Sequence, residues 1–250
     1  MPRPAEKRIP IQAEPSIMTR HGIATVVLLG LLVPPATAAQ PKVRLKVIQR
    51  VENGKDGLMR MDRVGSLALH GGFLYVSSPA ALNYFKRTLS SGRLIYAGEL
   101  AWKAGAARSP IAFAGGRMYH VAAAGKRDAR AALVWHEVEP RTGRPVEKGR
   151  IDCPKSVALI VAPDEKTLYL KTNVRTKSGT SKILWYHLDN DGKPGKGGEV
   201  TGKGLGPSTK PVDTVLQMSA DGRHLYNISG AEHAIGWVER KPDGSLAYKG

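Results

Sequence analysis

The sequence predicts an all-β protein built from repeated four-stranded antiparallel blades, the architecture of a β-propeller. Three observations lead to this prediction. A Tyr-containing strand pattern recurs roughly every 50 residues, an aromatic strand follows each copy, and a turn glycine follows each aromatic strand. The 28 glycines and 17 prolines interrupt the chain too often for a helical bundle or a coiled coil.

Each copy of the repeat begins with a short alternating strand, a tight turn and a second strand that contains Tyr. Gly-Gly and Asp-Gly pairs in these turns supply the positive φ that a tight hairpin requires. The four copies are Leu67–Tyr75, Ile111–Tyr119, Val157–Tyr169 and Val215–Tyr226.

A second aromatic segment follows each anchor tyrosine and predicts the third strand, because Tyr and Trp fit a pleated, half-buried surface. These aromatic residues are Tyr84, Phe85, Trp135, Trp185, Tyr186 and Trp237, and the turn glycines after them are Gly92, Gly143, Gly192 and Gly244. After three of the turns a fourth strand is expected, as in Arg93–Gly98 and Ser245–Gly250.

One such sheet cannot bury both of its faces, so we expect it to stack on copies of itself. A period of about 40–50 residues with four strands is typical of a propeller blade. A β-sandwich is the alternative, although it does not need the same aromatic and turn glycine in the same order. About four blades are visible, which favours a partial or truncated propeller over a closed four-bladed ring. Its open blade edge would invite self-association.

The first 38 residues are predicted to be a targeting leader and not part of the fold. Ile23–Val33 is apolar, follows Arg20 and is too short to cross a bilayer as a helix. Ala36–Ala38 supplies a small-residue cleavage site. We therefore expect a signal peptide with an N-terminal extension over residues 1–38, cleaved near Ala38.

This leader places the repeat domain at residues 39–250 and predicts a secreted or periplasmic protein without a transmembrane anchor after cleavage. Translation starts at either Met1 or Met18. Cys153 is the single cysteine, so no intramolecular disulfide can form even in an oxidising compartment.

Two segments of the last repeat carry a resemblance to a known family. Ser219–Ser229 and Ala234–Leu246 are similar to the strand pairs of lactonase-like seven-bladed propellers, which include relatives of 6-phosphogluconolactonase and 3-carboxymuconate cyclase. Val161–Tyr169 repeats the first of these patterns. The resemblance covers roughly residues 62–250. It implies a hydrolase acting on a sugar lactone or a related cyclic ester, on a propeller of seven blades.

No sharp catalytic or metal-binding motif is present, and we predict neither a metal nor a cofactor. Propellers usually bind ligands at the mouth of the central channel, where the chain enters the innermost strands. The candidates at these entry points are Asp62, Arg63, Arg108, Lys155 and Asp213. The three cations are predicted to bind an anionic group of the substrate, and Asp213 or Asp62 to act as a general base toward water. Ordinary solvated loop charges are the alternative interpretation.

The formal net charge of +17 favours an anionic partner. Nucleic acid is not expected, because the lysines and arginines are spread among the turns, with no basic helix and no RNP-type aromatic motif. Two functions are therefore left open. One is a lactonase-like hydrolase for a small anionic sugar or lactone. The other is a non-catalytic secreted propeller that binds protein or an anionic polysaccharide at the cell envelope.

Overall fold

The computed structural model describes residues 49–52, 61, 64–101, 110–123, 130–172, 182–202, 205, 214–229 and 234–250. In this part of the chain, sixteen β-strands form four antiparallel sheets of four strands each, and no α-helix is present. Correspondingly, the described residues include no helix that is long and apolar enough to span a membrane. The predicted leader, residues 1–38, lies outside the described residues.

Each sheet is a meander in which the strands pair in chain order. Blade 1 contains β1 (Ser66–His70), β2 (Phe73–Ser77), β3 (Ala81–Arg87) and β4 (Leu94–Ala101). Blade 2 contains β5 (Ile111–Ala114), β6 (Arg117–Ala123), β7 (Arg130–Val138) and β8 (Pro145–Pro154). Blade 3 contains β9 (Ser156–Val161), β10 (Thr167–Thr172), β11 (Lys182–Leu188) and β12 (Pro194–Thr201). Blade 4 contains β13 (Thr214–Met218), β14 (His224–Ser229), β15 (Ala234–Arg240) and β16 (Leu246–Tyr248).

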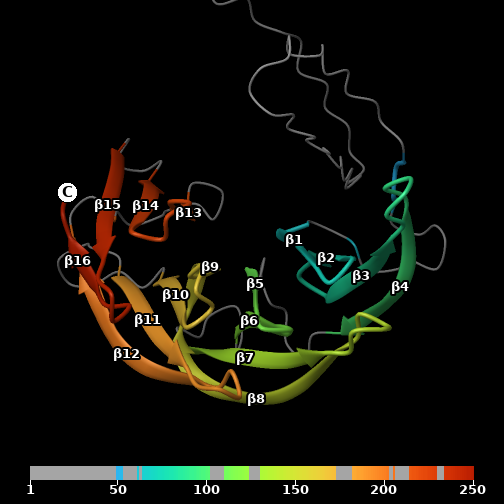
Figure 1. Ribbon diagram of the computed structural model, residues 1–250, viewed down its shortest axis with the longest axis horizontal. Helices are drawn as coiled ribbons and strands as arrows, with labels where there is room; N and C mark the ends of the chain where they lie inside the picture. The colour runs from blue at the N-terminus through green and yellow to red at the C-terminus, as the bar shows by residue number, and fades with distance from the viewer. Residues whose placement is uncertain are drawn as a thin grey trace, which may run out of the picture.

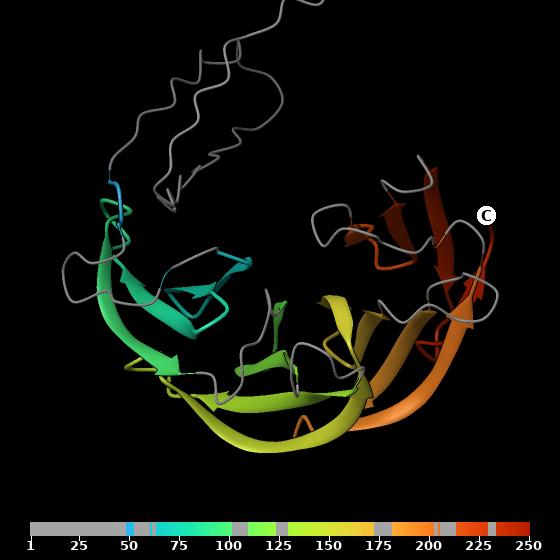
Figure 2. The same cartoon turned by 180° about the vertical axis from the view of Figure 1, so that it is seen from behind.

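The four blades stand side by side along an open arc (Figures 1 and 2). The first strand of each blade lies innermost, and neighbouring inner strands contact one another from β1 through β5 and β9 to β13. Blade 1 and blade 4 form the two ends of the arc. The all-β, partial propeller of four blades predicted from the sequence is confirmed, and the fourth strand is present in every blade.

Neighbouring blades pack through opposite faces of their sheets. We call the face that carries the anchor tyrosine (Tyr75, Tyr119, Tyr169 or Tyr226) the Tyr face, and the other face the back face. Between blades 2 and 3, Tyr119 and Leu133 of the Tyr face pack against Leu168 and Leu184 of the next back face. The interfaces of blades 1 and 2 and of blades 3 and 4 are built in the same way. The hydrophobic core is therefore a series of layers between blades, as a stack of single sheets requires.

A hydrogen bond joins the anchor tyrosine of one blade to the turn glycine of the next blade across each interface. The hydroxyl of Tyr119 donates to the carbonyl of Gly192 in the next blade, at 2.8 Å. The equivalent bonds run from Tyr75 to Gly143 and from Tyr169 to Gly244, both at 2.9 Å. All three tyrosines are fully buried, so each hydroxyl needs such a partner. The anchor tyrosine and the turn glycine are thus two halves of one contact.

The turn position needs glycine for two reasons: the backbone has a positive φ, and the preceding blade lies close to the Cα atom. Gly143 has a φ of +71°, and a Cβ at this position would lie 2.4 Å from the ring of Phe73. Gly192 has a φ of +68°, and its Cβ would lie 2.2 Å from Cδ of Arg117. A side chain at Gly143 would therefore collide with a packed ring of the preceding blade.

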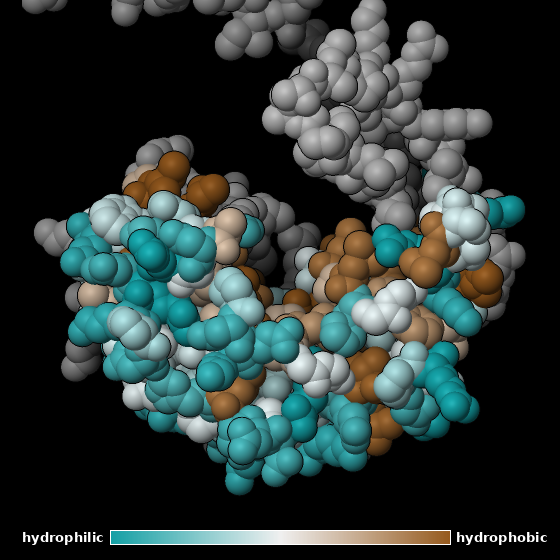
Figure 3. Space-filling model, viewed as in Figure 1, coloured by the Kyte–Doolittle hydropathy of each residue, from teal (hydrophilic) through white to brown (hydrophobic). Residues whose placement is uncertain are grey.

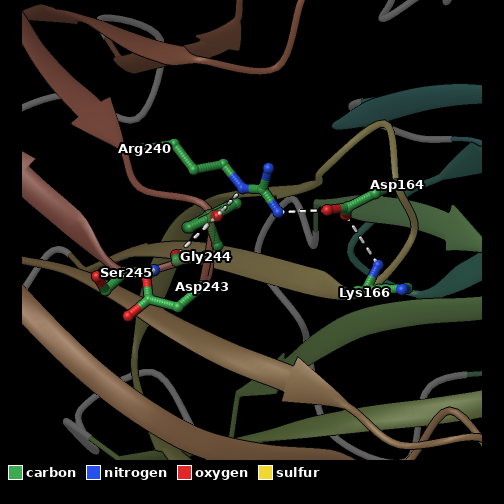
Figure 4. A network of polar contacts seen from close by, with 7 residues as sticks. Asp164, Lys166, Arg240, Asp243, Gly244 and Ser245 are labelled. Atoms are coloured by element: carbon green, nitrogen blue, oxygen red, sulfur yellow. Dashed lines mark hydrogen bonds and ion pairs between the residues drawn. The ribbon is translucent and has the colours of Figure 1, made fainter.

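A charged network reinforces the contact between blades 3 and 4 (Figure 4). Nε of Arg240 donates to the hydroxyl of Tyr169 at 2.7 Å, and its guanidinium also pairs with Asp164. Burial alone would raise the pKa of Asp164, but hydrogen bonds from the backbone amide of Lys166 and from Arg240 hold it below its ordinary value. The network links the first turn of blade 3 to the last turn of blade 4, and it serves the fold.

A second glycine, in the fourth strand, lies under the aromatic residue of the third strand. Gly149 pairs with Trp135, and a Cβ on this glycine would lie 2.5 Å from the indole ring. The same arrangement joins Gly98 to Tyr84 and Gly198 to Trp185. In these three blades a β-bulge follows the aromatic residue directly. The bulge and the glycine together let the large ring lie flat against its own sheet.

Substituting Gly143 with Ala should test how closely the blades approach. Gly116 is the matched control, because its φ is +76° and a Cβ there would meet no atom within 4 Å. Both variants carry the strain of a positive φ, but only Gly143→Ala also meets Phe73. We expect Gly143→Ala to lose about 1–3 kcal/mol more unfolding free energy than Gly116→Ala, measured by urea denaturation. Equal losses would contradict the close packing of this turn.

Candidate functional site

The entry edge of the arc, where the innermost strands begin, is where the sequence predicts a ligand site. Of the predicted residues, Asp62, Arg63, Arg108 and Asp213 lie outside the described residues, so their convergence stays a prediction. Lys155 is described. It directly precedes β9 and is half-buried at the entry edge of blade 3.

A second lysine, which is not among the site residues predicted from the sequence, lies at the same edge. Lys171 on β10 is fully buried, and its ammonium group donates to Oδ1 of Asn227 on β14 of the next blade. Ser156 pairs with Thr172, so Lys155 and Lys171 occupy the same end of two adjacent strands. Two lysine side chains therefore lie near the entry edge of blade 3.

The position of Lys171 in the repeat shows that the fold does not demand a cation there. The equivalent residues of the other blades are Ser77, Val121 and Ile228. Burying an ammonium group is costly unless polar atoms replace its water, and the fully buried amide of Asn227 supplies one of them. The sequence carried a signal for this residue, because Lys171 directly follows the apolar run Leu168–Leu170 within one strand.

A buried pair of histidines lies on the back face of blade 2, toward blade 1. The Nε2 atoms of His120 and His136 are 3.1 Å apart. Burial, the neighbouring His136 and the charge of Arg150 lower the pKa of His120 to about 3. Burial and Arg150 lower the pKa of His136 to about 4, against the opposing effect of Glu147. Both imidazole rings are therefore neutral at neutral pH. Among the described residues, no group of three His, Cys, Asp or Glu side chains could hold a metal ion.

Cys153 is not a nucleophile. The side chain is buried in the layer between blades 2 and 3, and burial raises the pKa of its thiol to about 12. The group stays protonated at physiological pH and behaves as a packing residue.

The histidine pair should make stability depend on pH. Because the pKa of each ring is lower in the folded chain than the ordinary 6.5, the unfolded chain binds more protons between about pH 6.5 and pH 4. The free energy of unfolding should therefore fall as the pH is lowered through this range. His136→Phe, which copies the aromatic residue at the equivalent position Phe85, should make this dependence shallower. The exposed control His187→Gln should leave it unchanged, and identical pH profiles for all three proteins would contradict this account.

Comparison with known proteins yields structural neighbours, while no protein-family model and no curated protein matches the chain. A functionally unknown protein from Desulfotomaculum acetoxidans aligns with a TM-score of 0.55 at 13% identity, over 81% of this chain and 60% of that protein. A putative 6-phosphogluconolactonase from Bacteroides uniformis aligns with a TM-score of 0.45 at 16% identity, over 74% of this chain and 70% of that one. The periplasmic gluconolactonase PpgL of Pseudomonas aeruginosa gives 0.46 at 10% identity, over 81% and 73%.

The last two of these structural neighbours are named as lactonases. At these identities the likeness concerns the fold. The chain spans 60% of the length of the Desulfotomaculum protein. The chain is a partial β-propeller in architecture, and its activity has to be argued from its own residues.

Proposed function

We propose that this chain hydrolyses a sugar lactone or a related cyclic ester that carries an anionic group, and that it does so in the cell envelope or outside the cell. The observation that carries the proposal is the pair of lysines at the entry edge, half-buried Lys155 and buried Lys171. The strand motifs that resemble lactonase-like propellers supply the reaction class.

Lys155 and Lys171 would have different roles in binding, because Lys155 is half-buried and Lys171 is fully buried. Lys155 meets solvent and can form an ion pair with a phosphate or carboxylate that arrives at the inner surface. Lys171 is buried between two blades, where its side-chain nitrogen donates to Asn227, so it would not contact the substrate directly. Arg63 and Arg108, which precede β1 and β5, would add bidentate contacts to the same anion.

Hydrolysis then needs one base and one water molecule. The carboxylate of Asp213, or that of Asp62, would remove a proton from water as its oxygen bonds to the lactone carbonyl carbon. The ring C–O bond breaks, the ring oxygen takes up a proton, and a hydroxy acid leaves. Asp213 directly precedes β13, and Asp62 lies four residues before the first residue of β1, so both come shortly before an innermost strand, where a base could meet an anion held by Lys155.

A second function is favoured by a different observation. The Tyr face of blade 4 is open at the end of the arc, which suits a propeller that binds a macromolecule without catalysis. In this alternative the cations at the entry edge would hold an anionic polysaccharide of the envelope.

The hydrolase proposal predicts a dependence on substrate charge. We expect the chain to hydrolyse a phosphorylated δ-lactone faster than the uncharged δ-lactone of the same sugar. Lys155→Ala should lower kcat/KM for the phosphorylated substrate about tenfold, equivalent to about 1.4 kcal/mol, and leave the uncharged one nearly unchanged. Proton release in a pH-stat measures both rates.

The controls separate binding from chemistry. Lys196→Ala removes an exposed cation from the outermost strand of blade 3 and should change neither rate. Asp213→Asn should abolish turnover, and Arg108→Ala should weaken binding of the phosphorylated substrate. Unchanged rates in both variants would refute these assignments, and no turnover of any δ- or γ-lactone by the wild type would favour the binding function.

A further inference from the structure

The turns that join the third and fourth strands differ in chemistry from blade to blade. They lie at the edge opposite the entry edge, because the strands of a meander alternate in direction, and we call this edge the turn edge. In blades 3 and 4, the turns at residues 189–193 and 241–245 hold three aspartates and two lysines, and no Leu, Ile, Val, Met or aromatic residue. In blade 1, the turn at residues 88–93 holds Leu89 and no acidic residue.

Leu89 is presented to solvent by an ordered turn. It is 80% exposed, more than any other large hydrophobic side chain among the described residues. The backbone amide of Thr88 donates to the carbonyl of Arg93 at 2.8 Å, and the amide of Gly92 donates to the carbonyl of Thr88 at 2.7 Å. Ile95, the second residue of β4, is 59% exposed. Neither Leu89 nor Ile95 belongs to a core cluster of the described residues, so packing of the fold does not account for them.

Three cations of blade 1 lie around these apolar side chains. Lys86 pairs directly with Ile95 across β3 and β4. Arg87 is the last residue of β3, and Arg93 is the last residue of the turn. None of the three cations forms an ion pair with a carboxylate in the described part of the chain. They are therefore available to an anionic partner.

The last turn of blade 2 brings two more cations to the same place. Gly143 in this turn lies against the ring of Phe73, and Phe73 pairs with Lys86. This packing places Arg141 and Arg144, both exposed, beside the part of blade 1 that carries Lys86.

The charges of the blade 2 turn are close enough to act on blade 1. Burial raises the pKa of Tyr84 on β3, while Arg144 lowers it and Glu139 raises it. Glu139 is the one acidic residue in residues 86–93 and 139–144, against five cations. Its carboxylate accepts a hydrogen bond from the hydroxyl of Thr142 at 2.8 Å. The turn edge is thus strongly positive at blades 1 and 2 but not at the turns of blades 3 and 4.

Apolar and cationic side chains therefore share one surface at this end of the arc. In Figure 3, the arm formed by blade 1, on the right, shows hydrophobic surface directly beside strongly hydrophilic surface. We call the set the turn patch, and it consists of Lys86, Arg87, Leu89, Arg93, Ile95, Arg141 and Arg144.

We propose that the turn patch binds the surface of an anionic lipid bilayer, with Leu89 and Ile95 inserted among the headgroups and the cations at the lipid phosphates. Apolar insertion and a cluster of cations are each weak alone, and together they give stable binding at a membrane surface. A hydrated polyanion would satisfy the cations but would offer no apolar medium to Leu89. The proposal goes beyond the hydrolase function and does not depend on it, because Lys155 lies at the opposite edge.

Co-sedimentation of the purified 250-residue chain with vesicles tests the proposal. We expect binding to phosphatidylcholine vesicles that contain phosphatidylglycerol to be stronger than binding to phosphatidylcholine alone. Arg93→Gln should weaken binding to the anionic vesicles about fivefold, the effect of one cation near such a surface. Leu89→Ser should weaken it about tenfold, because the inserted leucine is lost.

Matched controls separate the turn patch from the general positive charge of the chain. Ile235→Ser removes a side chain that is 68% exposed on blade 4, and Lys193→Gln removes a cation from the turn of blade 3. Neither change should alter binding. Equal losses for Leu89→Ser and Ile235→Ser, or no preference for anionic vesicles, would refute the proposal. Weaker binding of Arg93→Gln with unchanged binding of Leu89→Ser would assign the patch to a hydrated polyanion, and the membrane proposal would be wrong.

A local probe keeps the test decisive even if the apolar segment Ile23–Val33 also binds vesicles. Cys153 is buried, so a thiol-reactive, polarity-sensitive dye should label Leu89→Cys at the new cysteine. Its emission should rise and shift to the blue with anionic vesicles, whereas the same dye on Ile235→Cys should not change. A dye at position 89 that stays in water while the chain is bound to vesicles would overturn the proposal.

Discussion

The hydrogen bond from the anchor tyrosine to the turn glycine of the next blade is the contact on which the arrangement of blades depends. Tyr75, Tyr119 and Tyr169 each cross an apolar layer to reach a carbonyl on the next sheet. Apolar burial attracts the sheets without direction, whereas this bond fixes how far one blade is shifted and rotated relative to its neighbour. The glycine then decides how close the blades can come.

Much of this fold could be predicted from the sequence because the repeat places the same chemistry in every blade. Tyr, the second aromatic residue and the turn glycine recur in order, and each has one physical task in the observed interfaces. The glycine of the fourth strand was missed, although Gly98, Gly149 and Gly198 also recur. Its task is to make room for a ring on the neighbouring strand, and spacing along the chain does not show which strands will be neighbours.

The candidate site could be predicted only in outline. Lys155 follows from its place before an inner strand, since every blade begins in the same way. Lys171 could be noticed as a lysine in an apolar strand, but its contact with Asn227 could not be predicted, because it joins two residues of different blades and departs from the repeat in both. A repeat predicts what its copies share, while the properties that distinguish one interface from another arise from contacts between copies.

The tyrosine bonds also determine the order in which the protein can become stable. The two partners of each bond are 68, 73 and 75 residues apart, so each blade leaves the ribosome well before the turn that completes its interface. Every newly made Tyr face is thus exposed until most of the following blade has been synthesised. Stability grows along the chain by nearest-neighbour steps, as in other repeat proteins. A pause in translation within blade 2 or blade 3 would therefore hold open an apolar face that has not yet met its partner.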